Sequence, residues 1–263
     1  PGFCVGCPER PVFAAMRIAG RELGAFHVSA DIGCHTFATL PPFNLGNTVL
    51  GYGLGLASNS AMQPMFGRRT VTVMGDGGFW HNGLTSGIAN AVFNKDDGIL
   101  VIMKNGYSSA TGAQELPSSP QHSEPKADVA IERALEGIGV GWMRTVDNYR
   151  VGAVAQTLKE AMTTDYQGLK VIVAEGECQL ERQRRLRPQV AERLAKGQRN
   201  VRVRYGVDED TCSGDHSCIR LSGCPTLTVK DNPDPLRSDP VATVIDGCVG
   251  CGLCGENAHA ATL

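Results

Sequence analysis

Two polar residues with metal-binding chemistry follow apolar segments in the first half of the chain. Asp76 lies in the sequence GDGG, directly after the segment RTVTVM, and Asn105 follows the segment ILVIMK about thirty residues later. Carboxylate and carboxamide oxygens are hard ligands of the kind that Mg²⁺ prefers, and glycines let the backbone approach phosphate oxygens closely. A GDG sequence alone is weak evidence for a binding site. Its pairing with an asparagine after the next apolar segment indicates a site for Mg²⁺ and a diphosphate.

Cysteine spacing indicates a second kind of chemistry. The chain has ten cysteines, and several have the CxxC spacing that proteins of reducing compartments use for metals or clusters. Cys248, Cys251 and Cys254 are separated by two residues each, as in a bacterial ferredoxin. In ferredoxins with two clusters, the fourth ligand comes from a Cys-Pro pair of the other cysteine group, and here Cys224 precedes Pro225. These four cysteines are predicted to bind one iron–sulfur cluster.

The reciprocal cluster site is incomplete. Cys212 and Cys218 occupy the first and third ligand positions, Asp215 lies between them, and no cysteine follows Cys254. A carboxylate is a harder and weaker ligand for such a cluster than a thiolate. This site could therefore hold a four-iron cluster with Asp215 as a ligand, a three-iron cluster, or no cluster, unless a cysteine beyond Leu263 completes it.

This chemistry requires elements that bring distant residues together. In the first part of the chain, glycine-rich turns separate apolar, β-branched segments from segments with helical spacing. Strands are predicted within 69–78, 97–106 and 169–178, and helices within 84–95, 127–139 and 151–162. This alternation predicts an α/β fold around a largely parallel sheet. Open sheets of this kind bind ligands at the carboxyl ends of their strands, where Asp76 and Asn105 would both lie.

Composition divides the chain into three parts. Residues 1–180 form the large α/β unit. Residues 181–205 contain nine Arg or Lys and two Glu, which predicts a basic linker. Its charge indicates either a solvated face or a docking surface for an anionic partner or a phosphate-bearing substrate. Residues 206–263 hold six of the ten cysteines and few apolar residues, so this small unit would need a metal or a cluster to fold.

The overall composition excludes several classes of protein. The chain has no run of about eighteen apolar residues that could cross a membrane, and its first residues lack the pattern of a signal peptide. A net charge of −2 gives no reason to expect nucleic-acid binding. The CxxC spacings favour a reducing compartment, so we predict a cytoplasmic protein.

Four segments together resemble a known family. The sequences GDGGFWHNGL, KNGYSSATGAQ, CVGCP and DIGCHTFATLPPF are similar to the diphosphate-binding domain of 2-oxoacid:ferredoxin oxidoreductases, most of all to the large subunits of the indolepyruvate-specific members. The resemblance covers essentially the whole chain. It implies a parallel-sheet domain that binds thiamine diphosphate, followed by a small C-terminal domain like bacterial ferredoxins.

The resemblance also implies site residues. Asp76 and Asn105 would bind Mg²⁺ through their side chains, and Tyr107 through its carbonyl oxygen. The residues implied around thiamine diphosphate are Gly75, Asp76, Gly77, Gly78, Asn105, Tyr107, Thr111 and Gly112. His81 in the sequence FWHNG either faces the thiazolium ring and the substrate as a catalytic residue, or is an ordinary histidine at the start of a helix.

A cluster beside the thiamine is a further implication of the family. The four cysteines outside the small domain would be its ligands: Cys4, Cys7, Cys34 and Cys178. The alternatives are a zinc ion on the same thiolates or free buried thiols. Together with the C-terminal sites, the resemblance implies two to three 4Fe–4S clusters.

The implied reaction is the oxidative decarboxylation of an aromatic 2-oxoacid, such as indolepyruvate or phenylpyruvate, with coenzyme A to an aryl-acetyl-CoA. Electrons would pass one at a time through the clusters to ferredoxin. These residues contain no duplicate of the large domain, so we expect a second, pyrimidine-binding thiamine domain or subunit in an oligomer. The alternatives are another class of 2-oxoacid, a non-oxidative thiamine-dependent decarboxylase, or a subunit that only transfers electrons.

Overall fold

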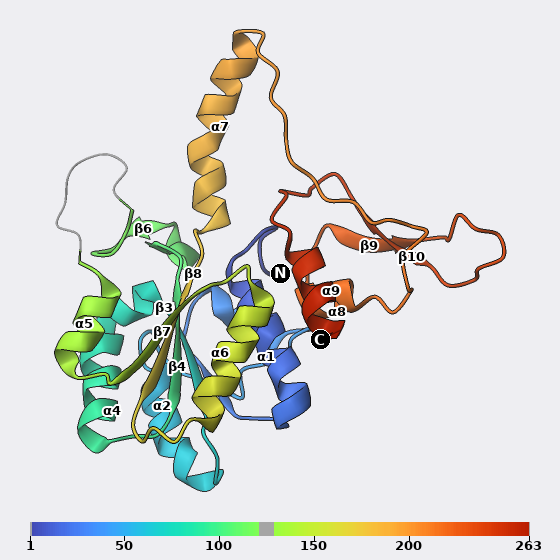
Figure 1. The fold of residues 1–263 in the computed structure, drawn as a ribbon. Helices are drawn as coiled ribbons and strands as arrows, with labels where there is room; N and C mark the ends of the chain where they lie inside the picture. Colours follow the sequence, from blue (N-terminus) through green and yellow to red (C-terminus); the bar gives the residue numbers. More distant parts are fainter. Residues whose placement is uncertain (1, 121–128, 263) are drawn as a thin grey trace.

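A six-stranded sheet forms the centre of the computed structural model, which describes residues 2–120 and 129–262 (Figure 1). Every neighbouring pair of strands in this sheet is parallel. In order across the sheet, the strands are β2 (Thr48–Val49), β1 (Val28–Ala30), β3 (Val71–Gly75), β4 (Ile99–Lys104), β8 (Lys170–Glu175) and β7 (Trp142–Asp147). The three strands β3, β4 and β8 are almost continuously buried, as expected for a parallel sheet covered on both faces.

Helices cover both faces of the sheet. One face packs against α1 (Glu9–Leu23) and α6 (Val151–Thr163), and the other packs against α2 (Gly55–Met62), α4 (Ala89–Asn94) and α5 (Ile131–Ile138). Successive side chains of a strand point to opposite faces, so Val73 contributes to the first apolar layer and Met74 to the second. The sheet is therefore enclosed between two apolar layers.

The elements predicted for the large unit are present. The strands predicted within 69–78, 97–106 and 169–178 are β3, β4 and β8. The helix predicted within 84–95 is the end of a continuous helical segment, made of α3 (Asp76–Gly78), the π-helix η3 (Phe79–Ile88) and α4. The helices predicted within 127–139 and 151–162 are α5 and α6, although residues 127–128 lie outside the described residues. The α/β fold class with a parallel sheet is confirmed.

Most of the predicted basic linker is helical. Helix α7 (Gln179–Ala195) has no buried residue and projects away from the sheet, as Figure 1 shows. Residues 198–208, which contain no helix or strand, connect α7 to the C-terminal region. None of the helices in the described residues is both long and apolar enough to cross a membrane.

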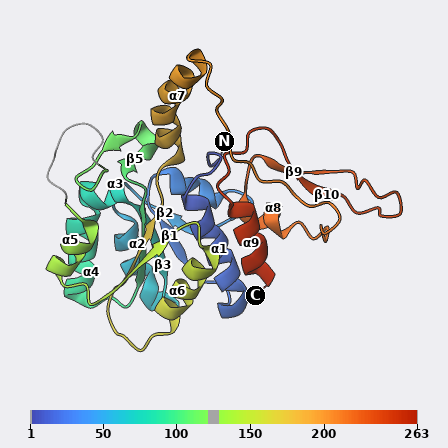
Figure 2. The ribbon, with the colours of Figure 1, turned by 45° about the horizontal axis from the view of Figure 1, so that its top comes forward.

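The C-terminal region packs against the sheet domain through its helices. It consists of α8 (Ser217–Ser222), the antiparallel strands β9 (Leu227–Lys230) and β10 (Val241–Val244), and α9 (Leu253–Thr262). Leu221 of α8 and Leu253 and Ala260 of α9 belong to the same buried cluster as the apolar residues of α1. Figure 2 shows α8 and α9 on the side of the molecule where α1 lies. The likeness of this region to a bacterial ferredoxin stays a prediction.

Candidate functional site

The carboxyl ends of β3 and β4 bring the two predicted magnesium ligands together. Asp76 and Asn105 follow these neighbouring strand ends in the parallel register. The Asp76 carboxylate is fully buried, and it accepts hydrogen bonds from the backbone N–H groups of Gly77 at 3.0 Å and Gly106 at 2.6 Å. Asp76 is thus fixed by the first turn of its own helical segment and by the residue that follows Asn105.

The Asn105 carboxamide is held by three contacts. Its Oδ1 accepts hydrogen bonds from the N–H of Tyr107 at 3.1 Å and from the hydroxyl of Ser109 at 2.9 Å. The Ser109 hydroxyl also lies 3.3 Å from the carbonyl oxygen of Tyr107. On the other side, Asn105 Nδ2 donates to Glu9 Oε1 at 3.5 Å. The carboxamide oxygen of Asn105 and the carbonyl oxygen of Tyr107, both predicted metal ligands, therefore share one hydroxyl partner.

Glu9, which sequence reasoning missed, completes this buried polar group. Its carboxyl group is almost fully buried, and its Oε2 has no hydrogen-bond partner among the described residues. Burial, together with the nearby charge of Asp76, raises the pKa of Glu9 to about 8, and burial raises the pKa of Asp76 to about 7. Two buried carboxyl groups beside a carboxamide are a donor set that suits a hard divalent cation. The only signal for Glu9 in the sequence was its position directly after CVGCP.

Close packing explains the glycines of the GDGG turn. A side chain on Gly77 would clash with the hydroxyl of Tyr52, and one on Gly78 would clash with the carboxylate of Asp31. Both carboxylate oxygens of Asp31 accept from the N–H of Gly53 at 2.8 Å. Tyr52 and Asp31 were missed because they precede the motif by more than twenty residues and approach it only through the fold.

His81 lies beside this packing. The centroid of its ring is 5.1 Å from that of Tyr52. Burial raises the pKa of Asp31 to about 6, and the nearby charge of His81 partly opposes this shift. His81 is exposed and belongs to the first turn of the π-helix η3, and π-helical turns are frequent at functional sites. The structure brings His81 close to the GDGG turn, and its catalytic role stays a prediction.

Thr111 and Gly112 lie at the turn of a small hairpin. This hairpin is formed by β5 (Tyr107–Ser108) and β6 (Gln114–Glu115). The Ser108 hydroxyl connects it to the glycine turn, because it lies 2.9 Å from the hydroxyl of Tyr52 and 3.4 Å from that of Thr111. Both Thr111 and Gly112 are exposed, and their contact with a cofactor stays a prediction.

His35 is a buried histidine that lies beside the end of β3, and sequence reasoning also missed it. Both ring nitrogens of His35 lack a hydrogen-bond partner among the described residues. Burial lowers the pKa of His35 to about 4, so its imidazole is neutral at pH 7. A Cβ added to Gly75 would lie 3.7 Å from this ring. No spacing in the sequence pointed to it.

The N-terminal cysteines lie beside Cys178. Cys4 and Cys7 enclose a tight turn in which the N–H of Cys7 donates to the carbonyl oxygen of Cys4 at 3.1 Å. A Cβ added to Gly176 would lie 2.7 Å from the Cβ of Pro8, which shows that the two cysteine-bearing segments are in contact. The fold therefore brings together residues that are about 170 positions apart in the sequence.

Cys34 belongs to the same neighbourhood. Burial raises the pKa of Cys34 to about 12, and the nearby charges of Glu9, Cys178 and Cys4 contribute to the shift. Burial also raises the pKa of Cys7, with contributions from Glu9 and Cys34. Cys34 therefore lies within electrostatic reach of Glu9 and of the other three cysteines implied as ligands of this cluster.

Four C-terminal cysteines line one small pocket. They are Cys224, Cys248, Cys251 and Cys254. Most of the remaining wall is apolar and includes Val5, Leu227, Val244 and Leu253. Burial raises the pKa of Cys254, and the charges of Cys251 and Cys224 add to the shift. Four cysteines in the wall of one largely apolar pocket are the type and number of ligands that a four-iron cluster requires.

The remaining predicted ligands lie apart from this pocket. Cys212, Asp215 and Cys218 are near one another, because Cys212 and Asp215 both contribute to the raised pKa of Cys218, which results mainly from burial. The Asp215 carboxylate accepts from the Ser213 hydroxyl at 2.7 Å and lies 3.8 Å from the Arg220 guanidinium. Within residues 2–120 and 129–262, no three His, Cys, Asp or Glu side chains are spaced to hold a single metal ion. The iron–sulfur ligand sets stay predictions.

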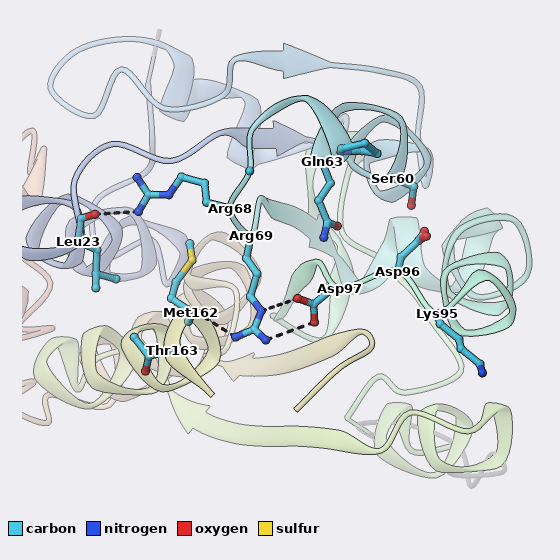
Figure 3. Close-up of a pocket in the computed structure, with 12 residues that line it drawn as sticks. Leu23, Ser60, Gln63, Arg68, Arg69, Lys95, Asp96, Asp97, Met162 and Thr163 are labelled. Atoms are coloured by element: carbon cyan, nitrogen blue, oxygen red, sulfur yellow. Dashed lines mark hydrogen bonds and ion pairs between the residues drawn. The ribbon is translucent and has the colours of Figure 1, made fainter. Parts of the chain in front are cut away.

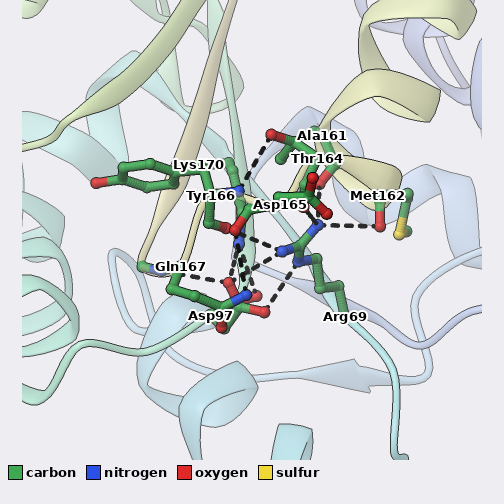
Figure 4. A network of polar contacts seen from close by, with 10 residues as sticks. Arg69, Asp97, Ala161, Met162, Thr164, Asp165, Tyr166, Gln167 and Lys170 are labelled. Carbon is green, nitrogen blue, oxygen red and sulfur yellow. Dashed lines mark hydrogen bonds and ion pairs between the residues drawn. The ribbon is translucent and has the colours of Figure 1, made fainter.

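A pocket of about 680 Å³ lies at the opposite, amino-terminal edge of the sheet (Figure 3). Arg69 in its wall donates to Asp97 at 2.9 Å, and Asp97 also pairs with the buried Lys170 (Figure 4). The Arg69 guanidinium further binds four carbonyl oxygens, those of Ala161, Met162, Thr164 and Tyr166. These contacts join the starts of β3, β4 and β8 to the end of α6. None of the predicted site residues lines this pocket.

Comparison with known sequences finds one matching family and several similar curated proteins. Residues 31–174 match the family described as thiamine pyrophosphate enzyme, C-terminal TPP binding domain. The chain is 30% identical over 271 residues to the indolepyruvate oxidoreductase subunit IorA of Pyrococcus horikoshii, with 97% of this chain and 39% of the relative covered. The corresponding subunit of Methanothermobacter thermautotrophicus is 27% identical over 264 residues, with coverages of 97% and 38%. The chain thus spans about two fifths of the length of these curated relatives.

A solved structure shares the fold. The 2-oxoglutarate:ferredoxin oxidoreductase from Magnetococcus marinus superimposes with a TM-score of 0.59 at 18% identity. The match covers 67% of this chain and 64% of that chain. At this identity, the likeness demonstrates a common architecture for the sheet and its helices.

Proposed function

The chain belongs to the thiamine pyrophosphate enzymes, whose C-terminal TPP-binding domain it matches, and from this membership we propose a specific function. The chain would be the diphosphate-binding part of a 2-oxoacid:ferredoxin oxidoreductase that acts on an aromatic 2-oxoacid with coenzyme A. Relatives named indolepyruvate oxidoreductase subunit support the substrate class, because they match 97% of the chain. The observation that carries the proposal is the buried group of Asp76, Asn105 and Glu9 at the carboxyl ends of β3 and β4.

Each residue of this group has a proposed task. Asp76 and Asn105 would hold Mg²⁺ by their side chains and Tyr107 by its carbonyl oxygen, since these are the oxygen donors at the strand ends. Glu9 would orient Asn105 through the contact with its Nδ2. When bound, thiamine diphosphate supplies the electron sink for decarboxylation of the 2-oxoacid.

The cysteine groups extend the proposal to electron transfer. Cys4, Cys7, Cys34 and Cys178, and the four cysteines of the C-terminal pocket, would hold iron–sulfur clusters, which supply one-electron transfer to ferredoxin. The curated relatives are named as subunits, which supports an assembly. A second thiamine domain or subunit would hold the pyrimidine ring of the cofactor. The proposed location is the cytoplasm.

Binding of the cofactor tests the diphosphate site. The complex purified anaerobically with its partner subunit would be titrated with thiamine diphosphate and Mg²⁺. We expect Asp76→Asn to weaken binding at least about 100-fold, because even residues that only support metal ligands cost 10–100-fold in affinity. Asp165→Asn, the same change at an exposed loop position, serves as the control and should bind like the wild type. Equal binding by Asp76→Asn and the wild type would overturn the proposed site.

Product analysis tests the reaction. Iron and acid-labile sulfide are first measured, and the complex is then incubated with phenylpyruvate or indolepyruvate, coenzyme A and a viologen dye. Dye reduction that matches aryl-acetyl-CoA formation is the expected result. Release of free aldehyde without dye reduction would instead identify a non-oxidative decarboxylase. Iron without any binding of thiamine diphosphate would identify a subunit that only transfers electrons.

A further inference from the structure

Arg10, the second residue of α1, is a buried cation with unfilled hydrogen-bonding capacity. Its side chain has no solvent exposure, and its Nη1 donates to the carbonyl oxygen of Ser222 at 3.1 Å. Its Nε and Nη2 have no hydrogen-bond partner in the described part of the chain. A buried guanidinium is costly unless an anion compensates its charge. Since no carboxylate is paired with Arg10 among the described ion pairs, its compensating anion has to be sought elsewhere.

Arg10 lies close to two groups of cysteines that are predicted to bind clusters. One group is Cys4, Cys7, Cys34 and Cys178, and the other is Cys224, Cys248, Cys251 and Cys254. Cys7 precedes Arg10 by three residues in the same segment, and Ser222, which Arg10 binds, precedes Cys224 by two residues. The N–H of Cys224 donates to the Ser222 hydroxyl at 3.2 Å, so Arg10 contacts the turn that carries Cys224. The Cys224 thiol lies 3.2 Å from the hydroxyl of Thr226 on this turn.

The two cysteine groups are also neighbours through the N-terminal turn. Val5 lines the pocket of the four C-terminal cysteines, and a Cβ added to Gly6 would lie 2.6 Å from Val249 Cγ2. The hydroxyl of Tyr149 donates to the carbonyl oxygen of Gly6 and so fixes this turn. The turn of Val5 and Gly6 thus contacts the C-terminal cysteine pocket, and Arg10 lies in the first turn of the helix that follows it.

We propose that Arg10 is a shared positioning residue whose charge raises the reduction potentials of the iron–sulfur clusters held by Cys7 and its partners and by Cys224 and its partners. This inference rests on the proposed function. In the transfer step, one electron leaves the first cluster, which is oxidised, and enters the second, which is reduced. No bond is formed or broken, and ferredoxin, a one-electron carrier, is the final acceptor. The reduced form of a cluster is more negative than the oxidised form, so a nearby buried cation stabilises it.

Reduction potentials test this role. The anaerobically purified complex would be titrated redox-potentiometrically, with electron paramagnetic resonance as the readout, for Arg10→Gln, Arg10→Met and Arg10→Lys. At an effective dielectric constant of about 20, loss of this nearby buried charge should lower the equilibrium constant for one-electron reduction about tenfold. That change equals about 59 mV for a single-electron couple. Arg10→Lys keeps the charge and should remain close to the wild type.

Arg17 provides the matched control. It lies on the same helix, is exposed, and donates to the carbonyl oxygen of Phe43 at 3.3 Å. Arg17→Gln should leave the potentials and the iron content unchanged. A shift of the same size in Arg17→Gln and Arg10→Gln would show that the effect is not specific to the buried site and would overturn the inference.

The remaining outcomes separate the inference from the proposed function. If the wild type holds its clusters and the neutral Arg10 variants keep both the iron and the wild-type potentials, the inference alone is wrong. If the neutral variants lose iron and Arg10→Lys retains it, the charge is required for the clusters, which supports the inference. If all three variants lose iron, Arg10 has a purely structural role. A wild type without iron would overturn the proposed function together with the inference.

Discussion

The buried carboxyl groups of Glu9 and Asp76 make the metal-free site sensitive to pH. Their ordinary pKa values are 4.5 and 3.8, and the fold raises them to about 8 and about 7, mainly through burial. At pH values between the ordinary pKa and the raised pKa of each group, the folded state binds more protons than the unfolded chain. The free energy of unfolding therefore falls as pH rises through this range, by about 1.4 kcal/mol per pH unit for each extra proton.

Comparison of the wild type with Glu9→Gln isolates this contribution, because the amide does not titrate. In urea unfolding with a chelator present at pH 5, 6, 7 and 8, the wild type should lose stability relative to Glu9→Gln as pH rises. Added Mg²⁺ should reduce the difference in stability between the wild type and Glu9→Gln at pH 8, since the cation would compensate the buried charges. A difference that is constant from pH 5 to 8 would show that Glu9 titrates normally.

Residues of the site differ in how far the sequence predicts them. Asp76 and Asn105 were predictable because both follow apolar strands of a parallel sheet, whose carboxyl ends meet at one edge. Glu9 and Arg10 lie at the start of a helix, and their burial results from contacts with residues about 100 and 210 positions away. Neither local spacing nor composition contains that information, so only the fold identifies them.

At the scale of elements, the buried network at the amino-terminal edge of the sheet stabilises the strands that carry the site. Lys170 at the start of β8 is fully buried and pairs with Asp97, which Arg69 also binds. We expect Lys170→Met to lower the free energy of unfolding by about 1.5–3 kcal/mol, because Asp97, whose side chain is 28% exposed, loses one of its two cationic partners. Urea denaturation measures this loss.

Lys159 is the control for this substitution. It pairs with Glu22 at 2.6 Å on the surface, and such exposed pairs contribute less than about 1 kcal/mol. Lys159→Met should therefore have a small effect. Equal losses in the two variants would contradict the structural role of the buried network.

The strands and helices themselves were predictable where most of their residues are buried and therefore apolar. β3, β4 and β8 are mostly apolar and almost continuously buried, and all three were found from the sequence. β7 is half exposed and carries the mixed sequence WMRTVD, so it shows no apolar run. Helix α7 buries none of its residues and therefore has no apolar face against the protein that would have predicted it.

At the scale of the whole molecule, the C-terminal region shares its core with the sheet domain. Leu253 is almost fully buried, lines the pocket of four cysteines, and belongs to the apolar cluster that includes α1. Because the cluster is continuous, the two regions should unfold together. Leu253→Ala is expected to lower the free energy of unfolding by about 2–5 kcal/mol, whereas Leu236→Ala, at a site that is 93% exposed, should change it by less than about 0.5 kcal/mol.

The two tryptophans make the cooperative unfolding measurable. Trp80 and Trp142 both lie in the sheet domain, so their fluorescence reports on that domain, whereas far-ultraviolet circular dichroism reports on the helices of both regions. If the regions unfold as one unit, Leu253→Ala should shift the denaturation midpoints of both signals equally. A variant in which only the dichroism midpoint moves would show that the C-terminal region unfolds independently. In that case the contacts of α8 and α9 with α1 would add little stability, and the N-terminal turn and Arg10 would contribute most to holding the two cysteine groups together.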